Sequence, residues 1–179
     1  MDIRLVGACA CLALLPQPGA AAQGGPPLAA TLGAIRDRIV AEGRVGYAAN
    51  LKDTADGQAW TNQFTAEATN VSVDLPSCTI SFHWKTSLQG KTVQDVDTAL
   101  RFAQFSKVSV ANREQEIRDQ VAAQHPSWVA VVSPAVWVVT FNVGDGAYVL
   151  DFTSRDAAER VVRAADHAMD LCNAPKAGF

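Results

Sequence analysis

Four cysteines occur among the 179 residues, and their positions constrain the fold more than any other feature of the sequence. Cys9 and Cys11 lie in an apolar N-terminal stretch that resembles a secretion signal, whereas Cys78 and Cys172 lie in the rest of the chain. Disulfides form and persist in oxidising compartments, so one pair surviving in an exported chain is typical of a structural disulfide. The sequence therefore predicts a covalent link between the middle of the chain and its end.

The N-terminus has the pattern of a secretory signal peptide. A short positive region precedes an apolar core at residues 5–15, and small residues follow, which predicts a signal peptide over residues 1–22. Removal of that peptide leaves a Gly/Pro linker at 23–27 and a single domain at 28–179. The apolar core is too short to cross a bilayer, which takes about 20 residues. We therefore expect an exported protein, periplasmic or extracellular, with no membrane span in the mature chain.

The charge balance is mild. The formal net charge is −3, from 15 Lys and Arg against 18 Asp and Glu. Nucleic-acid binders carry a basic face, and membrane-surface segments carry clusters of Lys and Arg. Neither pattern occurs, so we expect no nucleic-acid partner, and the partner would be a protein or a small ligand.

Hydrophobic periodicity predicts three helices and six or seven strands. The helices are expected at residues 28–42, 112–123 and 156–172, the first ending at Gly43 in the left-handed conformation. Residues that alternate between apolar and polar, or that are rich in β-branched and aromatic types, predict strands. These are expected at 45–51, 59–75, 78–88, 92–97, 102–110, 136–143 and 147–152, with a bulge or turn near 69–70 where the apolar face of the second changes phase.

Periodicity also places the two cysteines toward one core. Cys78 belongs to the apolar face of the clearest strand, and Cys172 belongs to the apolar stripe of the last helix. A sheet covered by a closing helix would bring these faces together. Loop-closure entropy would give such a bond about 4–5 kcal/mol of stabilisation.

These elements predict an α+β fold: a curved, mostly antiparallel sheet or partial barrel closed by the C-terminal helix, with an extra N-terminal helix. The hairpin at 136–152 followed by a helix from Asp156 resembles the pleckstrin-homology-like architecture, over about Val45 to Cys172. Lipid-binding members of that group carry basic residues in the first hairpin loop, but residues 52–57 are net acidic, so the resemblance implies no phosphoinositide binding. An alternative fold packs the first helix in the concave face of a curved sheet, as in cystatin-like cones.

No residue pattern assigns a catalytic, cofactor-binding or metal-binding role. His83, His125 and His167 are too widely spaced to indicate a metal site. There is no Gly-x-Ser-x-Gly elbow, and Gly144-Asp145-Gly146 between two strands is typical of a hairpin turn rather than a phosphate loop. The polar run at 113–119 is typical of a solvated helical face, with a partner-binding face as its alternative. The sequence thus leaves enzymatic activity undecided, with a non-enzymatic protein favoured.

Two residues remain as possible contacts. Trp128 lies in an expected loop, where an exposed aromatic ring could contact a partner, and His83 lies on the polar face of its strand. We expect a secreted or periplasmic binding or interaction module of unknown ligand. The alternative is a small secreted enzyme or a ligand-binding cystatin-like cone with a site near His83. A pocket with His83 beside a carboxylate would favour the alternative.

Overall fold

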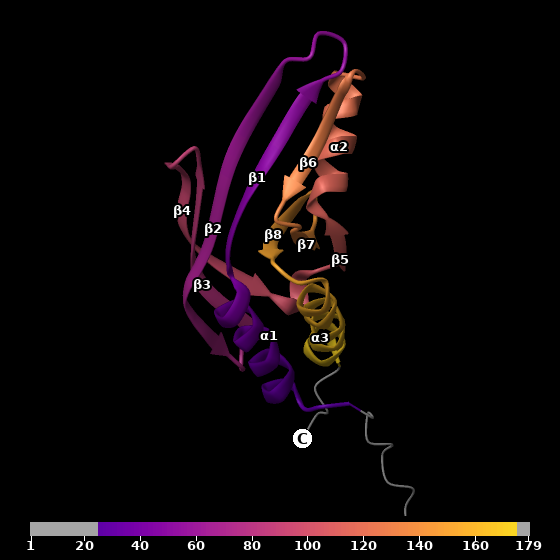
Figure 1. Cartoon of the computed structure of the whole chain (residues 1–179). Helices are drawn as coiled ribbons and strands as arrows, with labels where there is room; N and C mark the ends of the chain where they lie inside the picture. Colours follow the sequence, from indigo (N-terminus) through magenta and orange to yellow (C-terminus); the bar gives the residue numbers. More distant parts are fainter. Residues whose placement is uncertain (1–24, 175–179) are drawn as a thin grey trace, which may run out of the picture.

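The computed structural model describes residues 25–174, which form three helices, a short 3-10 turn and eight strands (Figure 1). In chain order these are α1 (Leu28–Glu42), β1 (Arg44–Asp53), β2 (Ala59–Asp74), β3 (Thr79–Leu88), β4 (Lys91–Arg101), η1 (Phe102–Gln104), β5 (Lys107–Asn112), α2 (Arg113–Gln124), β6 (Trp128–Ser133), β7 (Trp137–Val143), β8 (Gly146–Phe152) and α3 (Arg155–Asn173). The expected signal peptide, part of the linker and the last five residues of the expected domain lie outside the described residues.

The strands form two antiparallel sheets that do not close into a barrel. The larger sheet has the order β4-β3-β2-β1-β6, and the smaller has the order β5-β7-β8. β1 and β2 are long and extend together as an arm, with β6 and α2 beside them (Figure 1). The expected α+β class and antiparallel pairing are confirmed, but the single sheet of six or seven strands is wrong. The likeness to the pleckstrin-homology-like architecture stays a prediction from the order of elements.

Two regions differ from the expected strands, and the first of them divides the strands into two sheets. Residues 102–110 were expected to be one strand, but Phe102 and Phe105 are both buried around the 3-10 turn η1, so the chain leaves the larger sheet there. β6 was not expected, because both its buried residues (Ala130, Val132) and its exposed residues are apolar. Apolar residues on both faces remove the alternation that identifies a half-buried strand.

The other expected elements are confirmed, with small corrections. α1 has the expected bounds, but Gly43 has φ −73°, so the helix does not end in the left-handed conformation; the Gly43 N–H donates to the Ile39 carbonyl instead. Residues 59–74 form one strand whose register with β3 shifts between Thr69 and Ser72, where the phase of the apolar face changes. Asn112 and Ser154 cap α2 and α3 by accepting backbone N–H groups.

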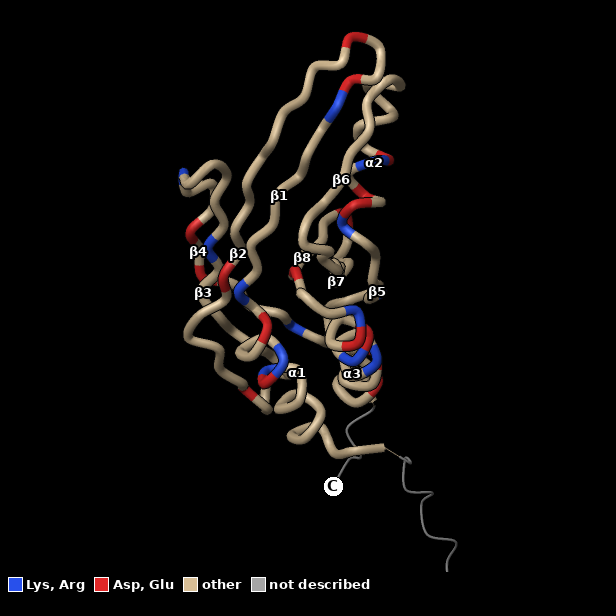
Figure 2. Tube along the Cα trace, viewed as in Figure 1, with Lys and Arg blue, Asp and Glu red and all other residues tan. Residues whose placement is uncertain are grey.

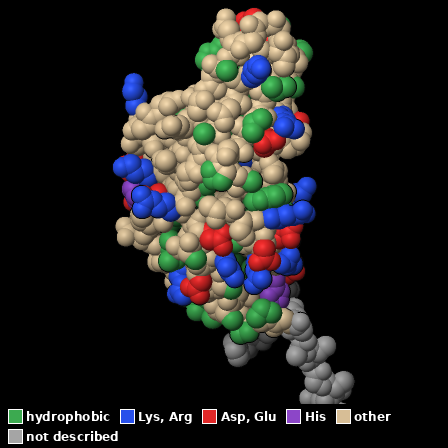
Figure 3. Space-filling model, in the orientation of Figure 1, with side chains coloured by type: hydrophobic (Ala, Val, Ile, Leu, Met, Phe, Trp, Pro, Cys, Tyr) green, Lys and Arg blue, Asp and Glu red, His purple; other side chains and the backbone are tan. Residues whose placement is uncertain are grey.

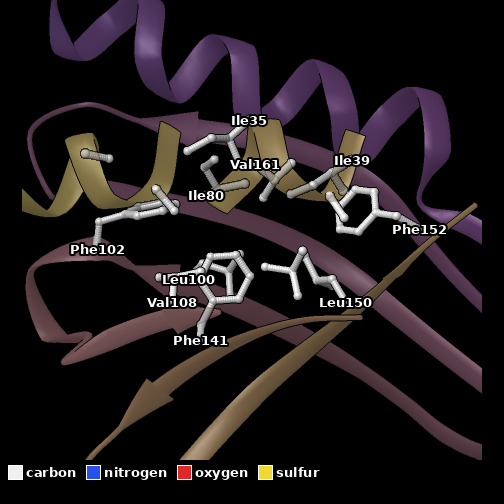
Figure 4. Packing of buried hydrophobic residues seen from close by; sticks show 14 of the residues in the cluster. Ile35, Ile39, Ile80, Leu100, Phe102, Val108, Phe141, Leu150, Phe152 and Val161 are labelled. Carbon is white, nitrogen blue, oxygen red and sulfur yellow. The ribbon is translucent and has the colours of Figure 1, made fainter. Parts of the chain in front are cut away.

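The hydrophobic core lies where α1 and α3 meet both sheets. Buried side chains from both helices, from η1 and from strands of both sheets pack together in Figure 4. They include Ile35 and Ile39 of α1, Ile80 of β3, Leu100 of β4, Phe102 of η1, Val108 of β5, Phe141 of β7, Leu150 and Phe152 of β8, and Val161 of α3. α1 and α3 lie side by side at the end of the molecule opposite the arm (Figure 1).

Cys78 and Cys172 lie within bonding distance as a disulfide, with their Cα atoms 6.0 Å apart, so the predicted pair is confirmed. Cys78 itself lies just before β3, with a positive φ of 52°, rather than in the strand. The bond attaches the C-terminal turn of α3 to the start of β3.

Charges of both signs are interleaved over α3 and α1 (Figure 2). Along α3, Arg155 and Arg163 both contact Glu159, and Arg160 contacts Asp156. On the face shown in Figure 3, charged side chains of both signs gather over the end of the molecule that contains α1 and α3, while fewer lie on the arm. Among residues 25–174, none of the helices combines the length and apolar character needed to cross a membrane.

Candidate functional site

A groove of about 830 Å³ lies between the inner face of the larger sheet and β8. In this region the register pairs Tyr47 with Phe64, Ala66 with Thr86 and Thr86 with Gln94, so β1, β2, β3 and β4 present these side chains to the same face. Five aromatic rings line the groove: Tyr47, Phe64, Phe82, Trp84 and Tyr148. Tyr47 and Phe64 stack with ring centroids 5.1 Å apart, and Phe82 meets Trp84 edge to face at 6.1 Å. The walls are therefore suited to apolar or aromatic groups.

Polar residues gather around Arg113, the first residue of α2, which also lines the groove. Its guanidinium donates from Nη1 to Glu116 Oε2 at 3.0 Å and from Nη2 to Asp151 Oδ1 of β8. The Arg113 and Asp151 side chains are only 19% and 8% exposed. Arg113 Nε is buried and has no hydrogen-bond partner within the described residues. A buried N–H without an acceptor is costly, and a bound acceptor group would satisfy it.

Tyr47 also lines the groove, and its burial is the main control on its ionisation. Burial raises the pKa of the Tyr47 phenol to about 12, against the smaller opposing effect of the Arg113 charge. The phenol is therefore neutral at physiological pH and can donate a hydrogen bond. Burial also raises the pKa of Glu116, again opposed by Arg113. A phenol of such high pKa and a guanidinium paired with two carboxylates are suited to binding and orienting a ligand rather than to exchanging protons.

His83 lies outside this groove, on the outer face of β3. Its Nδ1 is 3.0 Å from Asp97 Oδ1 and its Nε2 is 2.7 Å from Asp95 Oδ1, both on β4. Hydrogen bonds to Asp97 and Asp95 raise the pKa of the imidazole. A shallow depression of about 240 Å³ adjoins it. This is a histidine beside carboxylates, but both ring nitrogens are already engaged, which leaves neither for a substrate.

Trp128 begins β6 instead of lying in a loop. Its ring stacks with those of Trp60 and His125, with centroids 4.7 Å and 4.3 Å away, and its Nε1 donates to Asp53 Oδ2 at 2.9 Å. The pKa of the Asp53 carboxyl is lowered, first by a hydrogen bond from the Ala55 backbone N–H and then by hydrogen bonds from the side chains of Ser127 and Trp128. The half-buried Trp128 ring holds the end of the arm together, and Trp60 is the more exposed neighbour, at 40%. The two predicted contact residues thus lie on different parts of the molecule.

Sequence reasoning missed the groove and its polar cluster. It treated residues 113–119 as a solvated helical face, whereas Arg113 is largely buried against Asp151. The available signal was Asp151 itself, a carboxylate between Leu150 and Phe152 in an otherwise apolar strand, because a buried carboxylate needs a partner. His167, which was left without a role, lies with Nε2 2.9 Å from the Pro26 carbonyl oxygen.

Within residues 25–174, no three His, Cys, Asp or Glu side chains are grouped so that they could hold a metal ion. No protein-family model, curated protein or solved structure matches the chain. The function must therefore be argued from the groove and from the surfaces around it.

Proposed function

We propose that the protein is an exported, non-enzymatic binding module that takes an elongated, largely apolar ligand into the groove between its two sheets. The observation that carries this proposal is a groove of about 830 Å³ whose walls hold five aromatic rings and whose polar groups gather around Arg113. Small-molecule sites have volumes of about 300–1,000 Å³, mostly apolar walls and a few polar groups that fix orientation. The leader pattern and the Cys78–Cys172 disulfide support export.

A site near His83 has less support. A general base needs a ring nitrogen free to reach a substrate proton, and both nitrogens of His83 are bonded to aspartates. The depression beside it is small and lies on the outer face of the sheet. The enzyme or cone with a site at His83 therefore remains the second candidate, tested by the same binding experiment with a His83→Gln variant.

The neutral fluorescent probe N-phenyl-1-naphthylamine tests the groove. We expect saturable fluorescence enhancement with the wild-type protein. Thr86 is half-buried on the groove face of β3, so Thr86→Trp should fill the groove and abolish the enhancement. Gln63→Trp places the same ring on the exposed outer face of β2 and is the matched control. Equal binding by both variants, or loss of binding in His83→Gln, would contradict the proposal.

A further inference from the structure

β8 is the outermost strand of the smaller sheet, so one of its edges has no strand partner. Five consecutive residues, 147–151, line the groove. Side chains alternate between the two faces of a strand, so consecutive lining residues mean that the groove follows the edge of β8 as well as one face. In the antiparallel ladder with β7, every second residue directs its backbone N–H and C=O away from the partner. These groups point to the side where the groove lies.

The opposite wall contains a second open edge. β4 is the outermost strand of the larger sheet, and residues 96–99 of β4 also line the groove. The outer edge of β6, by contrast, is covered by side chains of α2. Arg118 Nε donates to the Ala130 carbonyl, and Glu114 Oε2 accepts the Val132 N–H. Within residues 25–174 no side chain makes such a bond to the backbone of β8 or β4. The fold therefore covers one vulnerable edge and leaves two open along the groove.

The polar cluster selects against an anionic ligand. With both carboxylates ionised, Arg113, Asp151 and Glu116 together carry one net negative charge. That net charge would repel a carboxylate head group. A neutral carbonyl would not be repelled, and it would accept a hydrogen bond from the free Arg113 Nε–H. The Tyr47 O–H, which stays neutral, is a second donor in the same region. Amide carbonyls combine neutrality with strong acceptor capacity.

We propose that the groove binds an extended peptide segment that adds as a strand to the open edge of β8. This inference rests on the proposed function and specifies its ligand class. The main-chain groups of the peptide would pair with those of residues 147–151, and its alternate side chains would enter the aromatic part of the groove. At about 3.3 Å per residue, that stretch of β8 matches a segment of about five residues.

Selection from a library of random heptapeptides displayed on phage tests the inference. Val149 pairs with Thr140 of β7, three pairs along from the pair of Val143 and Gly146 that closes the hairpin turn. At this position of an antiparallel ladder, the Val149 N–H points away from β7 and toward the open edge. Val149→Pro removes that N–H, and proline is tolerated on edge strands. We expect enrichment of peptides with alternating apolar residues on the wild-type protein and none on Val149→Pro. Equal enrichment on both would overturn the inference, provided that circular dichroism shows Val149→Pro folded.

An N-methyl scan of the best selected peptide, synthesised with blocked ends, gives the decisive result even if Val149→Pro does not fold. Removing one backbone donor that pairs with β8 should weaken binding by roughly fivefold to tenfold. Methylation should be harmful at alternate positions and tolerated between them, and the amides of Ala147, Val149 and Asp151, which point to the open edge, should exchange more slowly with the peptide bound. Uniform tolerance and unchanged exchange would refute strand addition. If N-phenyl-1-naphthylamine still binds and Thr86→Trp blocks it, the proposed function survives that refutation; if neither probe nor peptide binds, both fail.

Discussion

At the scale of single residues, the pairing of Arg113 with Asp151 joins α2 to β8. The first residue of a helix and a residue near the end of an edge strand are both largely withdrawn from water here. Breaking a buried ion pair by removing one partner is costly because an uncompensated charge remains, while replacing both partners by apolar groups is often neutral. The pair therefore fixes one wall of the groove more than it adds net stability.

Asp151→Ala should lower the free energy of unfolding by about 3 kcal/mol, because Arg113 would lose its most buried counter-charge. Asp151→Leu combined with Arg113→Met should recover most of that loss. Asp145→Ala, in the exposed turn between β7 and β8, is the control and should change stability by less than about 0.5 kcal/mol. Urea denaturation measures all of these variants. An Asp151→Ala protein as stable as the control would show that the pair is unimportant.

His83 makes stability depend on pH. Its pKa is raised above the ordinary 6.5, so its bonds to Asp97 and Asp95 stabilise the folded state most when the ring is protonated. That contribution is fully present below about pH 6 and is lost as the pH rises through the raised folded-state pKa. The stability difference between wild type and His83→Gln should therefore shrink from pH 5.5 to pH 9 in urea denaturation. A difference that grows with pH would contradict the protonated pair.

At the scale of elements, α2 acts as a cover for the edge of β6. It packs along that strand, and Glu114 and Arg118 bond both to β6 backbone groups and to each other at 2.6 Å. Exposed edge strands are templates for pairing with another chain, and β6 also carries the exposed Val129 and Val131. The two side chains thus satisfy the backbone and exclude another strand.

Glu114→Ala combined with Arg118→Ala should open this edge. We expect a loss of about 1–2 kcal/mol in unfolding free energy from two hydrogen bonds. Self-association should also increase relative to wild type, measured by sedimentation velocity over a range of concentrations. Gln120→Ala, on an exposed position of the same helix, should do neither. A double variant that sediments like Gln120→Ala would show that α2 does not protect the edge.

At the scale of the whole molecule, the disulfide closes a loop that contains all of the smaller sheet and three strands of the larger one, while β1 and β2 precede it. It connects residues separated by 94 positions, and between them lie β3 to β8 and most of α3. A link of this length restricts the unfolded chain strongly and leaves the packing of the core to side chains from both sheets and two helices.

Cys172→Ala should therefore lower the melting temperature by roughly 8–20 °C, from about 4–5 kcal/mol at about 2–4 °C per kcal/mol for a chain of this size. The far-ultraviolet circular dichroism of the folded variant should be retained. Reduction of the wild-type protein should give the same shift in calorimetry, and denatured protein without reductant should show no reactive thiol from this pair. An unchanged melting temperature would mean that the link contributes nothing.

Sequence patterns predicted the features that depend only on residues close together in the chain. The bounds of α1 follow from apolar residues that recur every three or four positions, and the Asn112 and Ser154 caps follow from polar residues placed just before such runs. The pairing of Cys78 with Cys172 was predicted as well, although Cys78 precedes β3 instead of lying on its apolar face. Such patterns state which side of an element is apolar. They do not state which elements share a sheet, so the strands expected to form one sheet belong to two.

By itself, then, the sequence determined the α+β class, most of the helices and strands, and the pairing of Cys78 with Cys172. Only the tertiary structure decided that β4 and β8 lie across one groove, and that Arg113 meets Asp151 there. Those contacts join residues far apart in the chain, and they depend on strand register and on where the chain leaves the first sheet. Local periodicity determines neither the register nor that point, because the same apolar faces can be buried in more than one arrangement.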